Sequence, residues 1–169
     1  YNYGTAGTYT LRIRGAFPRI YFNGGGDRQK LLDISQWGSL AWTSMASAFY
    51  GCSNLNISAT DVPDLSGVAD MSRMFQGCTA LDGPANIGTW NTSAVTDMGY
   101  LFYQASAFDQ PIDNWNTSAV TDMRYLFYQA TSFVQPIDSW NTAAVTNMSH
   151  MFEEPSFFNQ PIGDWKTEA

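Results

Sequence analysis

Tryptophan recurs every 25 residues through the second half of this 169-residue chain, at Trp90, Trp115, Trp140 and Trp165. The neighbouring residues repeat as well: Trp-Asn-Thr-Ser-Ala-Val-Thr-Asp-Met occurs twice, and a third copy changes only its Ser to Ala and its Asp to Asn. A fixed period of this length is typical of a solenoid. One repeat cannot bury its apolar side chains alone, so stacked repeats must share a continuous core.

Two looser copies of the repeat precede Trp90. Each has the tryptophan place, a methionine and a phenylalanine: Trp37, Met45 and Phe49, then Leu65, Met71 and Phe75, where Met71 lies six residues after Leu65 instead of eight. The sequence therefore predicts a repeat domain over residues 37–169. Its five coils, of 28, 25, 25, 25 and 25 residues, would begin at Trp37, Leu65, Trp90, Trp115 and Trp140.

The apolar residues within one coil step by three and four positions, as at Val95, Met98, Phe102 and Ala105. This spacing is typical of one face of a helix, and Asp97 suits a helix N-terminus. Pro111 cannot continue the helix, so an extended segment should follow. We therefore predict an α/β, leucine-rich-repeat-like solenoid of about five coils, each with one helix and one short strand.

The first 36 residues follow a different pattern. Tyr9, Leu11 and Ile13 alternate with polar residues, which predicts a half-exposed strand. Residues 17–22 are a second strand candidate, and the glycine-rich run 23–27 predicts a turn. We therefore expect residues 1–36 to form a β-hairpin cap over the first coil.

Charge is distributed unevenly along the chain. Residues 1–36 carry a net charge of +3, and residues 37–169 carry −10. A nucleic-acid partner is not expected, because phosphate binding requires a strongly basic face. Residues 34–60 lack charge but are crowded with Ser, Thr, Asn and Gln, so membrane insertion of the chain is not expected either.

The sequence lacks the motifs that indicate an enzyme active site. His150 is its single histidine, and no serine-hydrolase motif or phosphate-binding loop occurs, so we expect no catalysis, cofactor or metal site. Stacked acids such as Asp97 and Asp122 leave calcium as an alternative. Cys52 and Cys78 fill one place in adjacent coils, which favours two buried thiols, with a disulfide as the alternative.

Asparagine and threonine also form ladders at equivalent places, through Asn91, Asn116 and Asn141, and through Thr92, Thr117, Thr142 and Thr167. We expect the asparagine amides to satisfy backbone groups of the next coil. The threonine row also permits an ice-binding interpretation, although one threonine per coil does not make a flat paired array.

The repeated unit closely resembles the BspA-like leucine-rich-repeat family of bacterial surface proteins, over roughly residues 37–169. The resemblance implies a secreted or cell-surface protein that takes part in adhesion or protein binding, with an extracellular or host protein as partner. Separately, residues 3–13 resemble the closing strand of a PKD-type Ig-like domain, which implies that the cap is the remnant of such a domain.

The predicted helix directs two tyrosines of each central coil away from the core. Tyr100, Tyr103, Tyr125 and Tyr128 would then form one ligand-binding patch, because tyrosine is favoured at interfaces. A carbohydrate-binding surface with exposed aromatic rings, or a structural spacer, remains an alternative. Trp165 ends the last coil without a capping segment, so we expect apolar surface there and end-to-end self-association.

Overall fold

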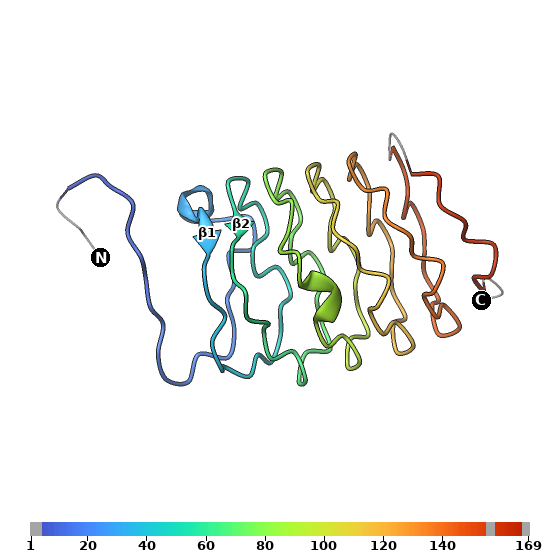
Figure 1. The fold of residues 1–169 in the computed structure, drawn as a ribbon, viewed down its shortest axis with the longest axis horizontal. Coiled ribbons are helices and arrows are strands. Elements are labelled where there is room, and N and C mark those ends of the chain that lie inside the picture. Colours follow the sequence, from blue (N-terminus) through green and yellow to red (C-terminus); the bar gives the residue numbers. More distant parts are fainter. Residues whose placement is uncertain (1–4, 155–157, 167–169) are drawn as a thin grey trace.

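The computed structural model describes residues 5–154 and 158–166. The chain forms a flat stack of coils that follow one another in sequence order, with the two ends of the chain at opposite ends of the stack (Figure 1). Each coil therefore packs mainly against its neighbours in the stack, as in other solenoids.

Regular secondary structure is sparse. Strands β1 (Asp33–Ile34) and β2 (Asn56–Ile57) pair in parallel, with Asp33 opposite Asn56. Two single-turn 3-10 helices span Arg28–Lys30 and Ile87–Thr89. No α-helix occurs in the described residues, so the predicted α/β solenoid of helix-plus-strand coils is wrong.

The hydrogen bonds of the central coils explain why no helix forms. Leu101, Tyr103 and Ala105 each donate a backbone N–H to the carbonyl three residues earlier, which closes a succession of β-turns. The residues between them donate to the next coil instead, as Phe102 does to the carbonyl of Leu126 at 3.0 Å. An α-helix requires every N–H to bond within its own segment, so the two patterns exclude each other.

The coil-to-coil bonds recur at every junction. Four alternate residues of one coil donate to four carbonyls of the next, and neighbouring donors are two residues apart. The donors are Met45, Ser47, Phe49 and Gly51; Met71, Arg73, Phe75 and Gly77; Met98, Tyr100, Phe102 and Gln104; and Met123, Tyr125, Phe127 and Gln129. Below, this arrangement is called the turn ladder.

The turn ladder also fixes the backbone conformation. In every coil, the residues that lie two and six positions after the methionine adopt positive φ. They are Ser47 and Gly51, Arg73 and Gly77, Tyr100 and Gln104, Tyr125 and Gln129, and His150 and Glu154. Positive φ at the third residue of a turn is the signature of a type II turn. It also breaks a right-handed helix, since L-residues are strained there.

An aspartate or asparagine stands before the methionine of each coil except the first, where Ser44 accepts the equivalent backbone N–H from Ala46 at 3.1 Å. The Oδ1 atom of Asp97 accepts the backbone N–H of Gly99 at 2.8 Å, and that of Asp122 accepts the N–H of Arg124 at 2.9 Å. This is an Asx turn, in which a short acceptor side chain bonds the backbone two residues later. The expected role of Asp97 at a helix N-terminus is therefore replaced by turn formation.

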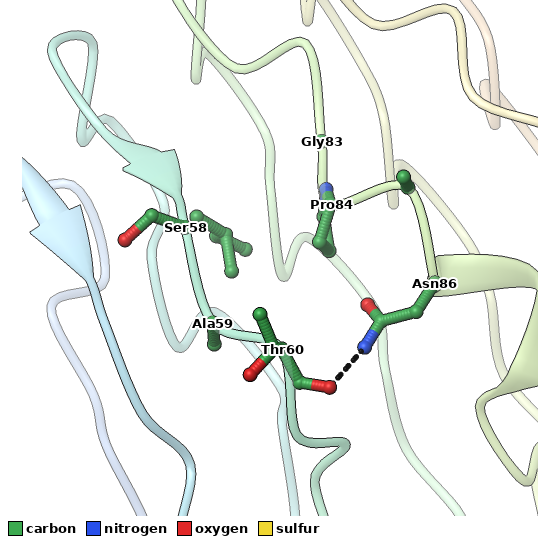
Figure 2. Close-up of a pocket in the computed structure, with 8 residues that line it drawn as sticks. Ser58, Ala59, Thr60, Gly83, Pro84 and Asn86 are labelled. Atoms are coloured by element: carbon green, nitrogen blue, oxygen red, sulfur yellow. Dashed lines mark hydrogen bonds between the residues drawn. The ribbon is translucent and has the colours of Figure 1, made fainter.

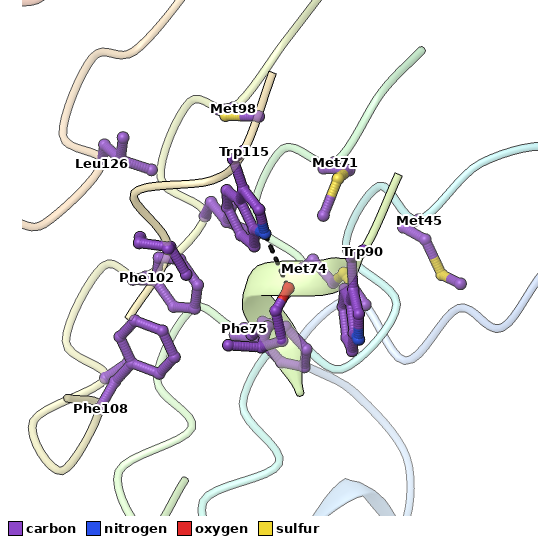
Figure 3. Close-up of a cluster of buried hydrophobic side chains, with 14 of the residues drawn as sticks. Met45, Met71, Met74, Phe75, Trp90, Met98, Phe102, Phe108, Trp115 and Leu126 are labelled. Atoms are coloured by element: carbon purple, nitrogen blue, oxygen red, sulfur yellow. Dashed lines mark hydrogen bonds between the residues drawn. The ribbon is translucent and has the colours of Figure 1, made fainter. Parts of the chain in front are cut away.

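Aromatic columns fill the core. Five phenylalanine rings stack through the coils at centroid distances of 5.7 to 5.9 Å: Phe49, Phe75, Phe102, Phe127 and Phe152. Figure 3 shows Phe75 and Phe102 of this column beside the buried methionines Met71 and Met98. The apolar spacing read as a helix face thus correctly identified the inward-facing residues, although the backbone is not helical.

The predicted tryptophan column is only partly regular. Trp115, Trp140 and Trp165 are buried and stack at 6.5 and 6.3 Å. The indole N–H of Trp115 donates to the carbonyl of Ile87 at 2.8 Å, as the dashed line in Figure 3 marks. Trp90 is buried too, but its ring meets Trp37 edge-on at 5.5 Å.

The asparagine and threonine ladders form different hydrogen bonds from those predicted. Asn91 and Asn116 accept bonds from the serine two residues later in their own coil, so the predicted bonding of these amides to the next coil is wrong. The buried hydroxyls of Thr92, Thr117 and Thr142 make that connection instead, as Thr92 does to the carbonyl of Asn116 at 3.0 Å. Burial removes this row from any ice-binding surface, and Thr167 lies outside the described residues.

The described part of the N-terminal region, from residue 5 on, contains no β-hairpin. Residues 8–14 are extended and exposed but pair in no strand among the described residues, so the predicted hairpin is wrong. Residues 17–34 do cover the first coil: Phe17, Ile20 and Phe22 pack on the core, and Gly24 donates to the carbonyl of Tyr50 at 3.0 Å. The predicted turn at residues 23–27 is present, with positive φ at Asn23, Gly24 and Gly26.

The positive-φ positions allow a direct test of the turn ladder. Gly77 has φ +70°, and an added Cβ would meet nothing closer than 3.7 Å, so Gly77→Ala should cost only backbone strain. We expect a loss of about 1–2 kcal/mol in the free energy of unfolding, measured by urea denaturation. Gly163→Ala is the control, because Gly163 lacks positive φ and has open space around it. Equal stability of the two variants would contradict the turn conformation.

Candidate binding surface

The four predicted tyrosines come together as two stacked pairs. Tyr100 lies over Tyr125 at 4.8 Å with planes 10° apart, and Tyr103 lies over Tyr128 at 4.7 Å with planes 6° apart. Contacts of 5.6 Å within each coil join the pairs into one cluster. Below, these four residues are called the tyrosine cluster.

The turn ladder, and not a helix, directs these rings outward. Tyr100 and Tyr125 sit at the positive-φ position two residues after the methionine, and Tyr103 and Tyr128 follow three residues later. All four side chains are half-buried. None of their hydroxyl groups bonds to a described residue, and none is buried, so all four remain available to a binding partner.

Charged groups lie at both ends of the cluster. The guanidinium of Arg73 lies 4.8 Å from the centre of the Tyr100 ring, within the range of a cation–π contact, and that of Arg124 lies 5.8 Å away. Arg124 also pairs with Asp122 at 3.3 Å. At the other end, His150 stacks on Tyr125 at 4.6 Å, and its Nδ1 atom contacts the carboxylate of Glu153.

Sequence reasoning missed Arg73 and Arg124, although a signal was present. Arg73, Tyr100, Tyr125 and His150 all lie two residues after the methionine of their coil. Stacked coils place equivalent positions in contact, so counting from each methionine would have joined Arg73 to the tyrosine row.

The hydroxyls of Tyr103 and Tyr128 remain protonated at neutral pH. Loss of solvent around the phenol raises the pKa of Tyr103, and the neighbouring tyrosines add to this effect. Desolvation likewise raises the pKa of Tyr128, with the Glu154 carboxylate as the next contribution. A partner therefore meets neutral hydroxyls that can both donate and accept hydrogen bonds.

A ladder of amides runs beside the tyrosine cluster. The Nε2 group of Gln104 donates to Oε1 of Gln129 at 2.8 Å, and Nε2 of Gln129 donates to Oε2 of Glu154 at 2.6 Å. These side chains, with Thr79, Ser106 and Thr131, line a shallow groove of about 510 Å³. All six lining residues have polar side chains, so the groove extends the hydrogen-bonding surface next to the rings.

A second, smaller hollow of about 300 Å³ lies between the first two coils. Figure 2 shows Ser58, Ala59 and Thr60 on one side and Gly83, Pro84 and Asn86 on the other. Both coils carry extra residues before their next tryptophan place, and these longer segments separate the coils here. Asn86 bridges the gap by donating to the carbonyl of Thr60 at 3.0 Å.

The remaining candidate sites have structural explanations. Cys52 and Cys78 are buried free thiols, and burial raises the pKa of Cys52 to about 12, which makes it unreactive. The stacked acids Asp97 and Asp122 already accept backbone hydrogen bonds in Asx turns. Across residues 5–154 and 158–166, no group of three His, Cys, Asp or Glu side chains is placed to hold a metal ion.

The C-terminal coil departs from expectation in one respect. Trp165 is buried by its own chain, so this ring is not part of the apolar surface expected there. The exposed apolar surface of this coil lies at Ile162 instead, beside the partly buried Phe152 and Phe158.

Comparison with known proteins assigns a family. The family described as "Mycoplasma protein of unknown function, DUF285" matches residues 69–169. The chain belongs to this family. The matched region holds the three most regular coils and the whole tyrosine cluster of this DUF285 chain.

No curated protein and no solved structure matches the chain. The described part of the chain contains no helix of the length and hydrophobicity needed to cross a membrane. The family description names no activity, so the chemistry of the surface itself must support a function for this DUF285 chain.

The acidic end of the cluster provides a test of its electrostatics. We expect Glu154→Gln to lower the pKa of Tyr128 towards its ordinary value, because a nearby carboxylate disfavours tyrosinate. Residue-specific NMR of 13C-labelled tyrosine rings against pH measures this shift. Asp138→Asn, in an exposed segment that does not affect the Tyr128 pKa, is the control. An unchanged Tyr128 pKa in the Glu154 variant would contradict the geometry.

Proposed function

We propose that this chain is a protein-binding adhesion module of a secreted or cell-surface protein, with the tyrosine cluster as its contact surface. One observation supports this most strongly: four half-buried aromatic rings bring together, on one face, four hydroxyls that bond to no described residue. Tyrosine is enriched in protein interfaces because it combines apolar area, a hydroxyl and few rotatable bonds.

The stacking of the rings favours a protein partner over a carbohydrate. Sugar recognition by aromatic residues uses the flat face of a ring, but Tyr100 and Tyr125 cover each other's faces. Arg73 lies over Tyr100 on one side of the stack and His150 over Tyr125 on the other. Ring edges and hydroxyls remain accessible, and these suit the mixed polar and apolar surface of a protein.

The surroundings of the cluster support the same conclusion. Only 14% of residues in the chain are charged, and the groove along Gln104 and Gln129 continues the surface with Glu154 as the one charged residue of its lining. Exposed Arg73, which forms no ion pair with a described residue, gives a partner one place for an acceptor group. Resemblance of the repeat to BspA-like surface proteins provides independent support for an adhesive role.

Replacement of all four tyrosines with serine tests the proposal. The wild-type protein and the variant are compared by surface plasmon resonance on purified fibronectin, laminin and collagen, and on a glycan array. We expect wild-type binding to a matrix protein and loss of that binding in the variant. Each stacked pair contributes about 0.5–1.5 kcal/mol, so the variant should melt at a lower temperature but still cooperatively.

A matched control removes aromatic and apolar surface elsewhere. Tyr21 and Leu32 are exposed and lie outside the cluster, so Tyr21→Ser with Leu32→Ser should leave binding unchanged. Binding of wild type only to glycans would favour the carbohydrate alternative. Absence of all binding would favour the spacer, and an unfolded four-serine variant would identify the rings as core.

A further inference from the structure

Two arginine side chains near the first coils have no acidic partner in the described part of the chain. Arg73 is exposed, and its guanidinium lies 4.8 Å from the centre of the Tyr100 ring. Arg28 is half-buried and begins the 3-10 helix Arg28–Lys30. Neither side chain forms an ion pair or a hydrogen bond with a described residue, so both guanidinium groups can bind acceptors on another molecule.

The fold holds Arg28 against the turn ladder of the first coil. Gly51 has positive φ there, and a Cβ added to it would lie 2.6 Å from Nε of Arg28 and 2.7 Å from its Cδ. The side chain of Arg28 therefore crosses directly over the backbone of Gly51. Asn54 anchors the same helix to the first coil, because its amide donates to the carbonyl of Gln29 at 2.8 Å.

The register of the coils places both arginines on the face that carries the tyrosine cluster. Gly51 and Arg73 occupy the two positive-φ positions that Gln104 and Tyr100 occupy in the third coil. Side chains at those positions of the third coil line the candidate binding surface. Arg28, which covers Gly51, therefore extends that surface over the first coil.

A third arginine adds positive charge at this end of the surface. Nη2 of Arg19 donates to the carbonyl of Ala46, in the turn ladder of the first coil, at 3.2 Å. The acids nearby in sequence are occupied elsewhere. Asp27 pairs with Lys30 at 3.0 Å, and Oδ1 of Asp70 accepts the N–H of the serine two residues later at 2.8 Å.

The charge distribution favours a partner with a few localised negative charges. A guanidinium binds a carboxylate through two parallel hydrogen bonds, which gives both strength and orientation. A densely charged polyanion such as a sulfated glycan fits less well, because residues 37–169 carry a net charge of −10 and repel it beyond the arginines. A protein segment with carboxylates among neutral residues avoids this repulsion.

We propose that the partner docks an acidic protein segment on this face, with its carboxylates bound by Arg28 and Arg73. Neutral residues of the same segment then lie on the tyrosine cluster. The docking rests on the proposed function, since the cluster supplies the adjoining contact surface. It adds the chemical class of the partner and the orientation in which the partner binds, with its acids over the first two coils.

Fluorescence anisotropy with two labelled synthetic peptides tests this docking. In the first peptide, glutamates alternate with serines around a central tyrosine, and in the second, glutamine replaces every glutamate. We expect the protein to bind the glutamate peptide, and to bind the glutamine peptide roughly tenfold more weakly or worse. High salt should weaken binding of the glutamate peptide, because it screens the charges.

Variants identify the groups that bind. Arg28→Gln with Arg73→Gln should weaken binding of the glutamate peptide by roughly tenfold or more. Arg73→Gln alone alters one exposed side chain, so it gives a folded protein for the same comparison. The matched control carries Arg14→Gln and Lys166→Gln, which removes two exposed charges outside the turn ladders and should leave binding unchanged. Thermal melting verifies that each variant folds.

Three results would overturn the proposal. Equal binding of the two peptides shows that the protein does not recognise carboxylates. Equal losses in the control and in the Arg73→Gln variant show only an effect of net charge. Heparin that binds through the same arginines and more tightly than the glutamate peptide identifies a sulfated glycan as the preferred ligand.

The matrix proteins separate this docking from the proposed function. Loss of matrix-protein binding in both the arginine variant and the four-serine variant supports both. Loss in the four-serine variant alone supports the adhesive surface and counts against acidic docking. Arginine-dependent binding of the glutamate peptide, with no binding to any matrix protein, supports acidic docking and counts against the adhesive role.

Discussion

The hydrogen bonds between coils determine the rest of this structure. Because alternate residues of each turn ladder donate to the following coil, their N–H groups are unavailable for a helix. The intervening residues close β-turns, and the turns impose the positive φ at Tyr100 and Gln104. A backbone hydrogen bond adds only about 0.5–1.5 kcal/mol of net stability. Four at each junction, together with stacked phenylalanines, nevertheless fix the register of every coil.

The register of the coils in turn determines the arrangement of the binding surface. Because every coil has the same register relative to the next, Tyr125 lies against Tyr100 and Tyr128 against Tyr103. The rings therefore stack as a result of the repeat itself, and no contact specific to one residue is needed. The same register extends the row to Arg73 before it and His150 after it. A shift of one residue would direct these rings into the core and Leu101 or Phe102 into solvent. The candidate site is therefore a consequence of the core packing.

Much of this could be predicted from the sequence, because the 25-residue period identifies equivalent positions. The buried residues, the two thiols and the grouping of the four tyrosines all follow from that period. The helix could not be excluded in the same way. Spacings of three and four residues suit a helix face, but they also suit successive turns closed between residues i and i+3. Local spacing does not reveal whether an N–H bonds within its coil or to the next.

The residue types at the positive-φ positions gave a weaker indication that turns, and not a helix, form here. Gly51 and Gly77 occupy the second positive-φ position of the first two coils, and glycine is the residue that tolerates this conformation best. Later coils have Gln104, Gln129 and Glu154 at this position, so their sequences do not reveal that it requires positive φ. The N-terminal segment misled for a different reason: alternation at Leu11 and Ile13 predicts a strand, but no described neighbour pairs with it.

Scalar coupling across hydrogen bonds tests the central claim most directly. NMR of the 15N- and 13C-labelled protein detects the coupling between an amide nitrogen and the carbonyl carbon that accepts its hydrogen. The turn ladder predicts that the amide of Phe102 couples to the carbonyl of Leu126, and that of Tyr100 to the carbonyl of Arg124. Coupling of Phe102 to the carbonyl of Met98, four residues earlier, would show a helix and contradict the account.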